Sequence, residues 1–500
     1  ILTAIAGFST QKNDYRFIQV NGSNYPNDNV QYVSAAGIVN AGTENRSQWS
    51  LVSYFGRVNY VLSDKYIVTA TMRRDGSSRF GSENKYGLFP SGAIAWRMSE
   101  ENFMRNIGSI SNFKWRLSYG ISGNNNIPNY AFVPNIVNTG YVFGTTPIVV
   151  NAILSGRLAN PSVTWETKKT INLGADIGLF NNRIEITTDF YKSNTDGLLL
   201  NVNIPAVSGF GTSLQNVGEV ENKGFEFAIS TKNLVNKIKW NTNANISFNR
   251  NKVLALGGAA GDFIDVGSSR TVVGKPLGLF YMRVTDGIFN TQEEINKHVP
   301  QDNAPKPGDR KFKDVNGDGA VNNNDLDFVG DPNPDFNYGI TNTISYKSFD
   351  FNLLINGVYG NDIFYNYAVG TNLNGNLNQD GVIRGRWRSP ENPGTGNIPK
   401  AISVANTLTA VPSDFFMLDG SYLRIANITL GYTFPNINNS KIKISNARLY
   451  VSGQNIFTFS KYPGYDPEIG AGGGNPLSNG VDAGIYPMSK LFSVGLNLTF

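Results

Sequence analysis

The sequence of 500 residues contains no cysteine and a single histidine, and each absence excludes a kind of chemistry. Without cysteine there are no disulfides, no thiolate nucleophile and no thiolate metal site. The one histidine, His298, lies in a polar stretch, which leaves no basis for most histidine-dependent catalysis or for a multi-histidine metal centre. No combination of serine, histidine and carboxylate that would support nucleophilic catalysis can be assembled. We therefore expect a protein that is not an enzyme.

Charged residues and long apolar runs are also scarce. Only 16% of the residues are charged and the formal net charge is +5, with no basic tail, so we expect no nucleic-acid binding. The sequence contains no window of about 18 apolar residues, so no transmembrane helix is predicted. The start at Ile1 lacks both an initiator Met and the basic beginning of a signal peptide. We expect the sequence to be part of a longer protein that has a further N-terminal portion.

Glycine and aromatic residues, by contrast, are abundant, and the chain ends in a strand with two different faces. There are 53 Gly, 31 Phe and 23 Tyr residues, which suits a sheet protein with many turns. Near the C-terminus Phe492, Val494, Leu496, Leu498 and Phe500 alternate with small or polar residues, so they share one face of a strand. The last strand of an outer-membrane barrel has this pattern because it must close the sheet. For this segment alone, the edge strand of a β-sandwich is an equal alternative.

The connections between strand-like runs alternate between short and long. Short connections are expected at about 63, 181, 347, 99–111, 233–237 and 435–446, and the longest loop at 249–336. This alternation is typical of a transmembrane antiparallel β-barrel, with tight periplasmic turns and long extracellular loops. A β-sandwich, the main alternative, has no physical reason to sort its loops by length. Residues 1–500 are therefore predicted to be all-β, with about fourteen barrel strands.

Aromatic residues near the ends of the predicted strands suggest belts at the two membrane interfaces. Tyrosine and tryptophan side chains favour the lipid headgroup region because one end of each is apolar and the other is polar. The residues expected in these belts are Tyr54, Trp115, Trp165, Tyr191 and Trp240. Packing in the core of a sandwich is the alternative for all of them.

The segment from Asp314 to Asp325 carries the strongest local motif. Oxygen-bearing side chains stand at positions 1, 3, 5 and 12, and a glycine stands at position 6, as in a calcium-binding loop. The predicted ligands are Asp314, Asn316, Asp318 and Asp325 with the carbonyl of Ala320. Position 12 is Asp instead of the usual Glu, which shortens its reach. We expect a structural calcium ion that stiffens an extracellular loop, and a metal-free turn is the alternative.

Several other polar loop residues give no comparable signal. Asp414, Asp419, Asp466 and Glu468 are scattered acids, which we expect to be solvated rather than to form a catalytic pair. The glycine-rich segment 470–474 follows no strand of a βα unit, so phosphate binding is not predicted there.

Short motifs along nearly the whole chain resemble those of the SusC/RagA family of TonB-linked outer-membrane proteins. They occur in the family's order: Gly56-Arg-Val-Asn-Tyr60, Asp75-Gly-Ser-Ser-Arg-Phe80, Phe89-Pro-Ser-Gly-Ala-Ile-Ala-Trp96, Ser122-Gly-Asn-Asn-Asn126, Asp286-Gly-Ile-Phe289, Pro332-Asn-Pro-Asp335, Ser452-Gly-Gln-Asn455 and Gly464-Tyr-Asp-Pro467. The run from Lys311 to Gly319 also matches, as do those from Asn216 to Glu226 and from Tyr422 to Gly431.

The resemblance implies the C-terminal part of a 22-stranded barrel in the outer membrane of a Bacteroidetes-type bacterium. It implies import of oligosaccharides or peptides, a SusD-like surface lipoprotein as lid, a dimer of the transporter–lipoprotein pair, and energy from TonB. The plug, the TonB box and the early strands have no counterpart in residues 1–500. The aromatic end at Phe500 resembles the signal that the barrel-assembly machinery recognises.

Aromatic residues in the long loops are the predicted ligand contacts, since their rings would stack on sugars. The candidates are Tyr365, Tyr367, Trp387, Phe415 and Phe416, and loop packing or lipoprotein contact is the alternative for each. Two other functions stay open, namely a TonB-dependent receptor for a metal chelate or cofactor, and a surface scaffold that does not transport.

Overall fold

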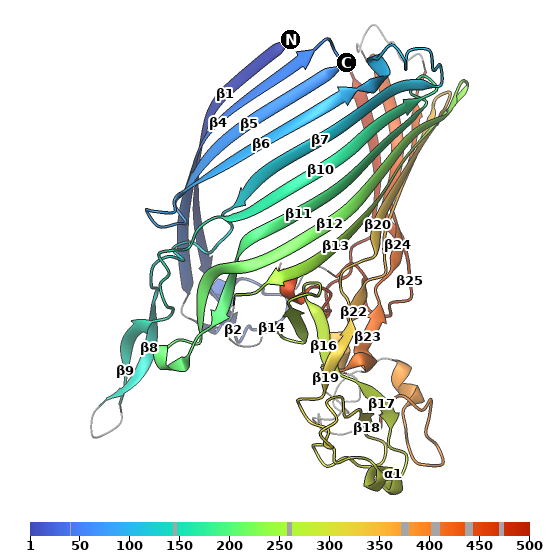
Figure 1. The fold of residues 1–500 in the computed structure, drawn as a ribbon. Coiled ribbons are helices and arrows are strands. Elements are labelled where there is room, and N and C mark those ends of the chain that lie inside the picture. The colour runs from blue at the N-terminus through green and yellow to red at the C-terminus, as the bar shows by residue number, and fades with distance from the viewer. Residues whose placement is uncertain are drawn as a thin grey trace.

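The main element of the computed structural model is one curved antiparallel sheet of 14 strands (Figure 1). The structure describes residues 1–40, 42–143, 148–257, 263–371, 379, 381–401, 411–435, 444–469 and 475–500. Neighbouring strands of the sheet follow one another along the chain, so that β1 forms one edge and β26 the other. The strands are β1 (Leu2–Gln19), β4 (Thr43–Leu62), β5 (Tyr66–Ser77), β6 (Tyr86–Arg97), β7 (Ile110–Asn124), β10 (Glu166–Leu179), β11 (Ile184–Asn203), β12 (Thr212–Val235), β13 (Ile238–Ala255), β20 (Phe336–Tyr346), β21 (Phe349–Tyr359), β24 (Tyr422–Thr433), β25 (Asn446–Ser460) and β26 (Leu491–Thr499). The predicted all-β antiparallel fold is confirmed.

The tight turns at one end of the sheet use residues that accept a left-handed backbone. Ser63 and Asp64 between β4 and β5 have φ values of 52° and 56°, and Asn181 and Asn182 between β10 and β11 have 58° and 55°. Asn and Asp tolerate this conformation better than most residues because their short side chains hydrogen-bond locally. These turns lie where the sequence predicts them, and they fix the register of each hairpin.

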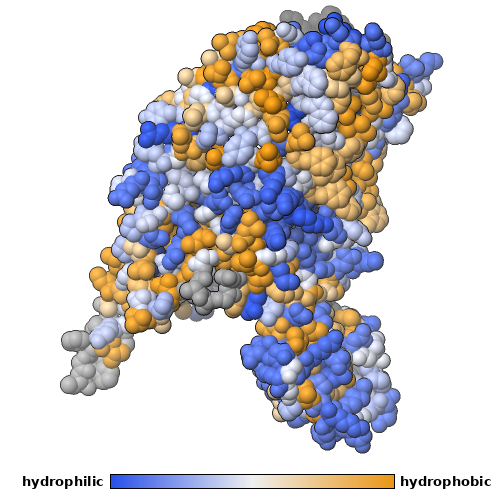
Figure 2. Space-filling view, viewed as in Figure 1, coloured by the Kyte–Doolittle hydropathy of each residue, from blue (hydrophilic) through white to orange (hydrophobic). Residues whose placement is uncertain are grey.

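The sheet has one apolar and one polar face. On β10, Ile171 and Leu173 are about half exposed on the apolar face. On the polar face Asp176 accepts hydrogen bonds from Arg116, at 3.1 Å for each of its two carboxylate oxygens. Figure 2 shows hydrophobic residues over the upper part of the sheet and a hydrophilic area below it. An apolar face toward lipid and a polar face toward a lumen is the pattern of a membrane barrel.

Helices play little part in this fold. Among the residues that the structure describes, none of the helices is both long enough and apolar enough to cross a membrane.

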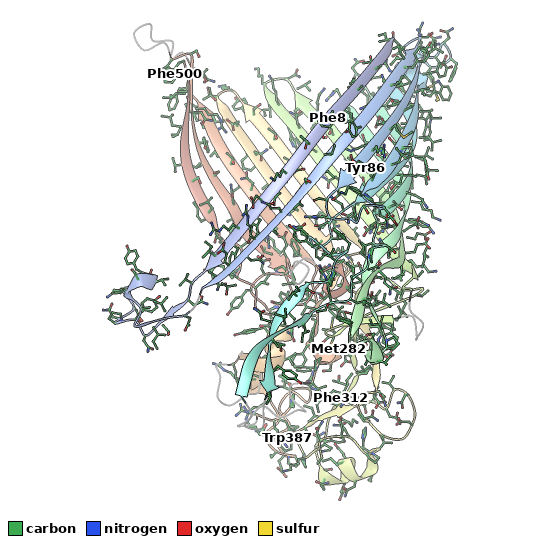
Figure 3. All side chains as sticks on the ribbon, turned by 90° about the vertical axis from the view of Figure 1, so that its left-hand side faces the viewer. Phe8, Tyr86, Met282, Phe312, Trp387 and Phe500 are labelled. Carbon is green, nitrogen blue, oxygen red and sulfur yellow. The ribbon has the colours of Figure 1, made fainter. Side chains whose placement is uncertain are left out.

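The loop end of the sheet carries a small folded unit, which we call the loop module: residues 263–330, 362–371 and 411–419. Figures 1 and 3 show it at the end opposite the tight turns, with Met282 and Phe312 inside it and Phe500 at the other end of the molecule. Its elements are β14 (Phe263–Val266), β15 (Ser269–Val272), β16 (Leu279–Arg283), β17 (Thr285–Ile288), α1 (Gln292–Lys297), β18 (Arg310–Phe312), β19 (Leu326–Gly330), β22 (Asp362–Phe364), α2 (Asn366–Thr371) and β23 (Met417–Asp419). Most of the predicted loop 249–336 is therefore folded.

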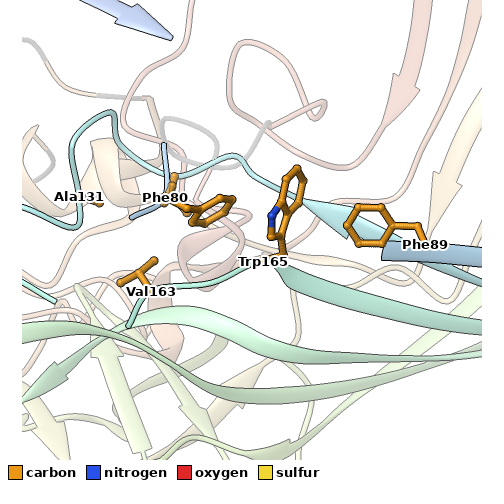
Figure 4. Packing of buried hydrophobic residues seen from close by; sticks show 6 residues of the cluster. Phe80, Phe89, Ala131, Val163 and Trp165 are labelled. Carbon is orange, nitrogen blue, oxygen red and sulfur yellow. The ribbon is translucent and has the colours of Figure 1, made fainter. Parts of the chain in front are cut away.

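Smaller hairpins and a buried cluster complete the loop end. The hairpins are β2 (Gly22–Ser23) with β3 (Ile38–Val39) and β8 (Ile136–Phe143) with β9 (Ile148–Ser155). Figure 4 shows the cluster, in which the ring of Trp165 lies 5.1 Å from Phe80 and 5.3 Å from Phe89. Because Trp165 is only 7% exposed, its expected place in a membrane-interface belt is wrong. Its indole nitrogen donates to the Lys85 carbonyl at 3.2 Å.

Candidate functional site

The loop module has an apolar core that brings together two of the predicted ligand residues. Phe416 is buried against Phe280 and Phe364, and Phe415 packs on the edge of the same cluster. The rings of Phe415 and Phe416 meet edge to face with 5.0 Å between their centroids. The β22–β23 pairing and the short 3₁₀ turn Asp414–Phe416 hold both rings in place. In this arrangement Phe416 stabilises the module from within.

Arg310 lies buried beside these two rings. Its guanidinium is 4.0 Å from the centroid of Phe415 and 5.1 Å from that of Phe416, within the range of cation–π attraction. Nη1 donates to the Ser413 hydroxyl at 3.3 Å, whereas Nε and Nη2 have no partner. Burial lowers the pKa of Arg310 to about 9, and the nearby charge of Asp414 opposes this shift. The side chain is still a cation at pH 7.

Tyrosines form a row that joins residues 365–367 of the module to the loop after β25. Tyr365 packs edge to face on Tyr462 at 5.6 Å and lies 6.3 Å from Tyr367, which in turn lies 6.5 Å from Tyr465. We call these four residues the tyrosine row. Exposure increases along it, from 7% for Tyr462 to 38% for Tyr367 and 66% for Tyr465. Its outer members therefore offer aromatic faces to a ligand.

A buried carboxylate anchors the inner end of the tyrosine row. The hydroxyl of Tyr462 donates to Asp482, which is itself buried. Asp482 also accepts backbone N–H groups from Gly484 at 2.7 Å and Ile485 at 3.2 Å. Burial, together with the hydrogen bond to Asp482, raises the pKa of Tyr462. Tyr462 is thus a fixed donor that orients the rest of the row.

A second buried ion cluster ties the loop after β25 to the sheet. Arg424 on β24 donates to Asp466 at 2.5 Å, to Glu468 at 2.6 Å and to the Thr458 hydroxyl at 3.0 Å. Asp466 is only 5% exposed, so the expectation that it is a solvated loop carboxylate is wrong. The physical reason is its pairing with a buried guanidinium, which a scattered acid does not reveal in sequence.

The remaining predicted ligand residue, Trp387, lies apart from the tyrosine row. It is buried, its backbone N–H donates to the Ile398 carbonyl at 2.9 Å, and its indole nitrogen has no partner. Ile398 belongs to a small cluster that touches Phe415. Ligand contact by Trp387 stays a prediction, and the packing that the structure shows for it resembles that of Phe416.

The predicted calcium loop forms a compact turn. Asp314 accepts backbone N–H groups from Gly317 at 2.8 Å and Gly319 at 2.9 Å, and the fully buried Asp325 accepts from Val315 at 2.9 Å. Both glycines have positive φ, 73° and 85°, which lets the chain bend sharply.

Further bonds join the other predicted ligands of this loop. The N–H of Asp318 donates to the side chain of Asn316 at 2.9 Å, and Asp318 accepts the N–H of Ala320 at 2.9 Å. Within the described residues, no three His, Cys, Asp or Glu side chains are grouped as a metal site. Asp325 accepts N–H groups from Val315, Asn316 and Asn322. A carboxylate has about four lone-pair sites, so even Asp325 keeps one, and a calcium ion stays a prediction.

The polar face of the sheet carries a charged wall toward the tight-turn end, close to the turn between β10 and β11. Arg116 on β7 also donates two bonds of 2.9 Å to Asp189 on β11, and Asn172 donates to the same carboxylate at 2.7 Å. One arginine therefore joins three neighbouring strands, since its other partner, Asp176, lies on β10. The wall is polar but its charges are paired.

Sequence reasoning missed Tyr462, Tyr465, Asp482 and Arg424. A usable signal existed for Tyr465, which stands in the quoted motif from Gly464 to Pro467, and for Arg424, which stands in the run from Tyr422 to Gly431. Their contacts, such as that of Arg424 with Asp466, are long-range, and no local pattern encodes them. Phe500 lies at the exposed end of the terminal strand, and its role as an assembly signal is untested.

A family model and two similar proteins point to the same family. The family model described as "TonB dependent receptor-like, beta-barrel" matches residues 3–456. TonB-dependent receptor P3 of Formosa agariphila is 36% identical over 514 residues, covering 100% of this chain and 50% of the relative. TonB-dependent receptor SusC of Bacteroides thetaiotaomicron is 34% identical over 467 residues, covering 90% of this chain and 44% of the relative.

A solved structure shares the fold. The RagAB peptide transporter matches with a TM-score of 0.79 and 24% identity, over 100% of this chain and 53% of that chain. The chain thus spans about half the length of the relatives that it matches.

Proposed function

This chain belongs to the TonB dependent receptor-like β-barrel family, and on that premise we propose that it is part of an outer-membrane importer of the SusC and RagA type. Members of the family are outer-membrane receptors and not enzymes. The activity, substrate and partners proposed here refer to a protein with the full length of these relatives, about half of which this chain matches.

The imported substrate in this proposal is an oligosaccharide. The observation that carries it is the tyrosine row, whose outer rings, Tyr367 and Tyr465, are exposed beside the loop module. Exposed aromatic faces stack on the C–H faces of sugar rings, and the fixed inner members of the row would keep them in position. A SusD-like surface lipoprotein would cover the ligand from outside, and TonB would supply the energy for release into the barrel.

A peptide is the second candidate substrate. It is favoured by the likeness to the RagAB structure, which is described as a peptide transporter. Tyrosine rings and the hydrogen-bonding groups of the loops would also suit peptide side chains and backbone. Calcium in the loop from Asp314 to Asp325 would be structural in either case, holding the loop module in shape.

Uptake by whole cells tests the proposal. A strain lacking the gene would be complemented with the full-length protein, either wild type or Y367A/Y465A, and given labelled oligosaccharides or peptides. Loss of two stacking contacts is expected to raise the half-saturating concentration about tenfold, at about 0.5–1.5 kcal/mol per aromatic contact. The control Y32A removes a tyrosine that is even more exposed, at 78%, but lies far along the chain from the row.

Each outcome of this uptake experiment separates one part of the proposal from the others. Saturable uptake of oligosaccharide that disappears in a strain without TonB supports active import. Uptake that persists without TonB rejects it, and uptake of peptide alone selects the second candidate. If Y367A/Y465A behaves like Y32A, the tyrosine row does not bind the substrate. Accumulation of a metal chelate instead would favour the alternative receptor class.

A further inference from the structure

Three basic residues lie side by side on the apolar, outward face of the sheet. In the strand register, Lys192 of β11 stands opposite Lys223 of β12, which stands opposite Arg250 of β13. Like charges directly opposite each other on neighbouring strands are destabilising unless anions lie close by. Two residues nearer the tight turns, Phe190, Phe225 and Phe248 form a parallel row.

The carboxylates near these residues are fewer than the cations. Glu221 accepts both Lys192, at 2.8 Å, and Lys223, at 2.6 Å, while Arg250 pairs with Asp335 at 2.5 Å. A fourth cation, Lys252, stands opposite Glu221 in the register. The side chains of Lys192, Lys223 and Arg250 are 51%, 58% and 60% exposed. An ammonium has three donors, so each lysine keeps donors for a further anion.

On the tight-turn side of the cations is an apolar groove of about 730 Å³ on the outside of the sheet. No carboxylate lines it. Its lining combines apolar side chains with the three cations: Leu117, Ile171, Leu173, Phe190, Phe225 and Phe248, with Lys192, Lys223 and Arg250. Aromatic contacts continue its floor across the strands, with 4.6 Å between the ring centroids of Phe190 and Phe225. An acyl chain would fit a surface of this composition.

The height of the three cations coincides with the membrane interface on the loop side. They lie about eleven residues from the nearest tight turn, which corresponds to about 28 Å along the membrane normal for strands that rise about 3.3 Å per residue and tilt by about 40°. The apolar band of an outer-membrane barrel is about 25 Å tall. Cations at this height therefore face the headgroups of the outer leaflet, and the groove faces its acyl chains.

We propose that this groove is a specific binding site for a phosphate-bearing lipid of the outer leaflet. Lys192, Lys223 and Arg250 bind the phosphate, and an acyl chain lies on the phenylalanine row. Charge-assisted hydrogen bonds to phosphate, made at the edge of an apolar medium, give the site its selectivity over neutral lipids. The proposal depends on the barrel lying in the membrane and not on which substrate is imported.

Native mass spectrometry of the full-length protein in detergent tests the site. The probes are lipid A, a diphosphorylated glycolipid, and the same lipid after enzymatic removal of its phosphates. We expect K192Q/K223Q to bind lipid A about tenfold or more weakly than wild type, and K192R/K223R to bind within about threefold of wild type. The matched control K347Q removes a lysine at the tight-turn end of the sheet, and it should bind like wild type.

Three results would overturn the proposal. The first is that K192Q/K223Q binds lipid A as tightly as wild type does, when circular dichroism shows that both proteins are folded. The second is equal binding of the dephosphorylated lipid, which would leave the cations without a role. The third is displacement of lipid A by millimolar inorganic phosphate, which would make the groove a site for the free anion.

Discussion

At the scale of the residue, buried arginines organise the loop end of this protein. Arg283, Arg310 and Arg424 are each at most 3% exposed, and each reaches across segments that are distant in sequence. A planar guanidinium with five donors suits this task because it satisfies several acceptors at once and stacks on aromatic rings. Arg283 illustrates it by binding Asp302 through two bonds, of 2.8 and 2.6 Å, and Asn323 through a third of 2.8 Å.

Removal of the charge on Asp302 should loosen the loop module. The hydrogen bonds from Arg283 lower the pKa of Asp302, so the carboxylate stabilises the folded module at every pH above its unfolded pKa near 4. This contribution is lost as the pH falls through the lowered pKa of the folded state. We expect D302N to cost about 1–3 kcal/mol at pH 7, because Arg283 then keeps buried donors without a charged partner.

Hydrogen exchange of the module's backbone amides between pH 7 and pH 3 would measure this effect. Protection should fall at pH 7 in D302N, whereas in wild type it should fall only on acidification. The matched control is D265N, which breaks an Arg–Asp pair whose carboxylate is more exposed, with a much smaller expected change. If D302N and D265N showed equal protection, the buried pair of Arg283 and Asp302 would contribute no more to the stability of the module than the more exposed pair of Arg270 and Asp265.

At the scale of the element, the sequence predicts the long hairpins well and the short elements poorly. From β4 onward the barrel strands alternate with period two and end at turn residues such as Asn181-Asn182, so their positions follow from local chemistry. The sequence gives no comparable signal for β1, because its first half carries apolar residues on both faces and its second half is largely polar. Strands as short as β16 and β18 contain too few residues to show any period.

The candidate site shows the same limit. The loop from Asp314 to Asp325 could be predicted because all its contacts are local, whereas the tyrosine row could not. Its members come from β22–α2 and from the loop after β25, about 100 residues apart, and only the fold brings them together. The ligand residues are predicted only because they are aromatic residues in loops. That criterion does not separate the buried Phe416 and Trp387 from the exposed Tyr367.

Calcium should stiffen the loop from Asp314 to Asp325 and, with it, the module. This loop packs into the module through Val321, which contacts Phe312 in a buried cluster. We expect added calcium to raise the thermal unfolding temperature of wild type by a few degrees and to leave D318A unchanged. D327A, which removes an exposed acid just outside the motif, is the control and should respond like wild type. If calcium did not shift the thermal unfolding curve of wild type, the loop would be a metal-free turn and the predicted calcium site would be wrong.

At the scale of the whole molecule, the two faces of the sheet fix the surroundings in which the fold is stable. Phe190, Leu173 and Leu117 are each at least 40% exposed on one face, while the other face holds paired charges such as Arg116 with Asp189. Monomeric soluble proteins rarely expose apolar patches larger than a few hundred Å². An apolar belt around a polar interior is stable only where lipid or detergent covers the belt.

Withdrawal of detergent should therefore make the purified full-length protein aggregate while its strands persist. Light scattering during dilution below the critical micelle concentration would show particles growing, and far-ultraviolet circular dichroism would still report β structure. Transfer into a lipid nanodisc instead should keep the protein dispersed, because acyl chains replace detergent on the same face. The expected difference arises from the outward face alone, since inner-face ion pairs such as Arg116 with Asp189 are the same in both media. A dispersed, folded monomer without detergent would contradict the assignment of the apolar face to lipid, and with it the membrane-barrel architecture.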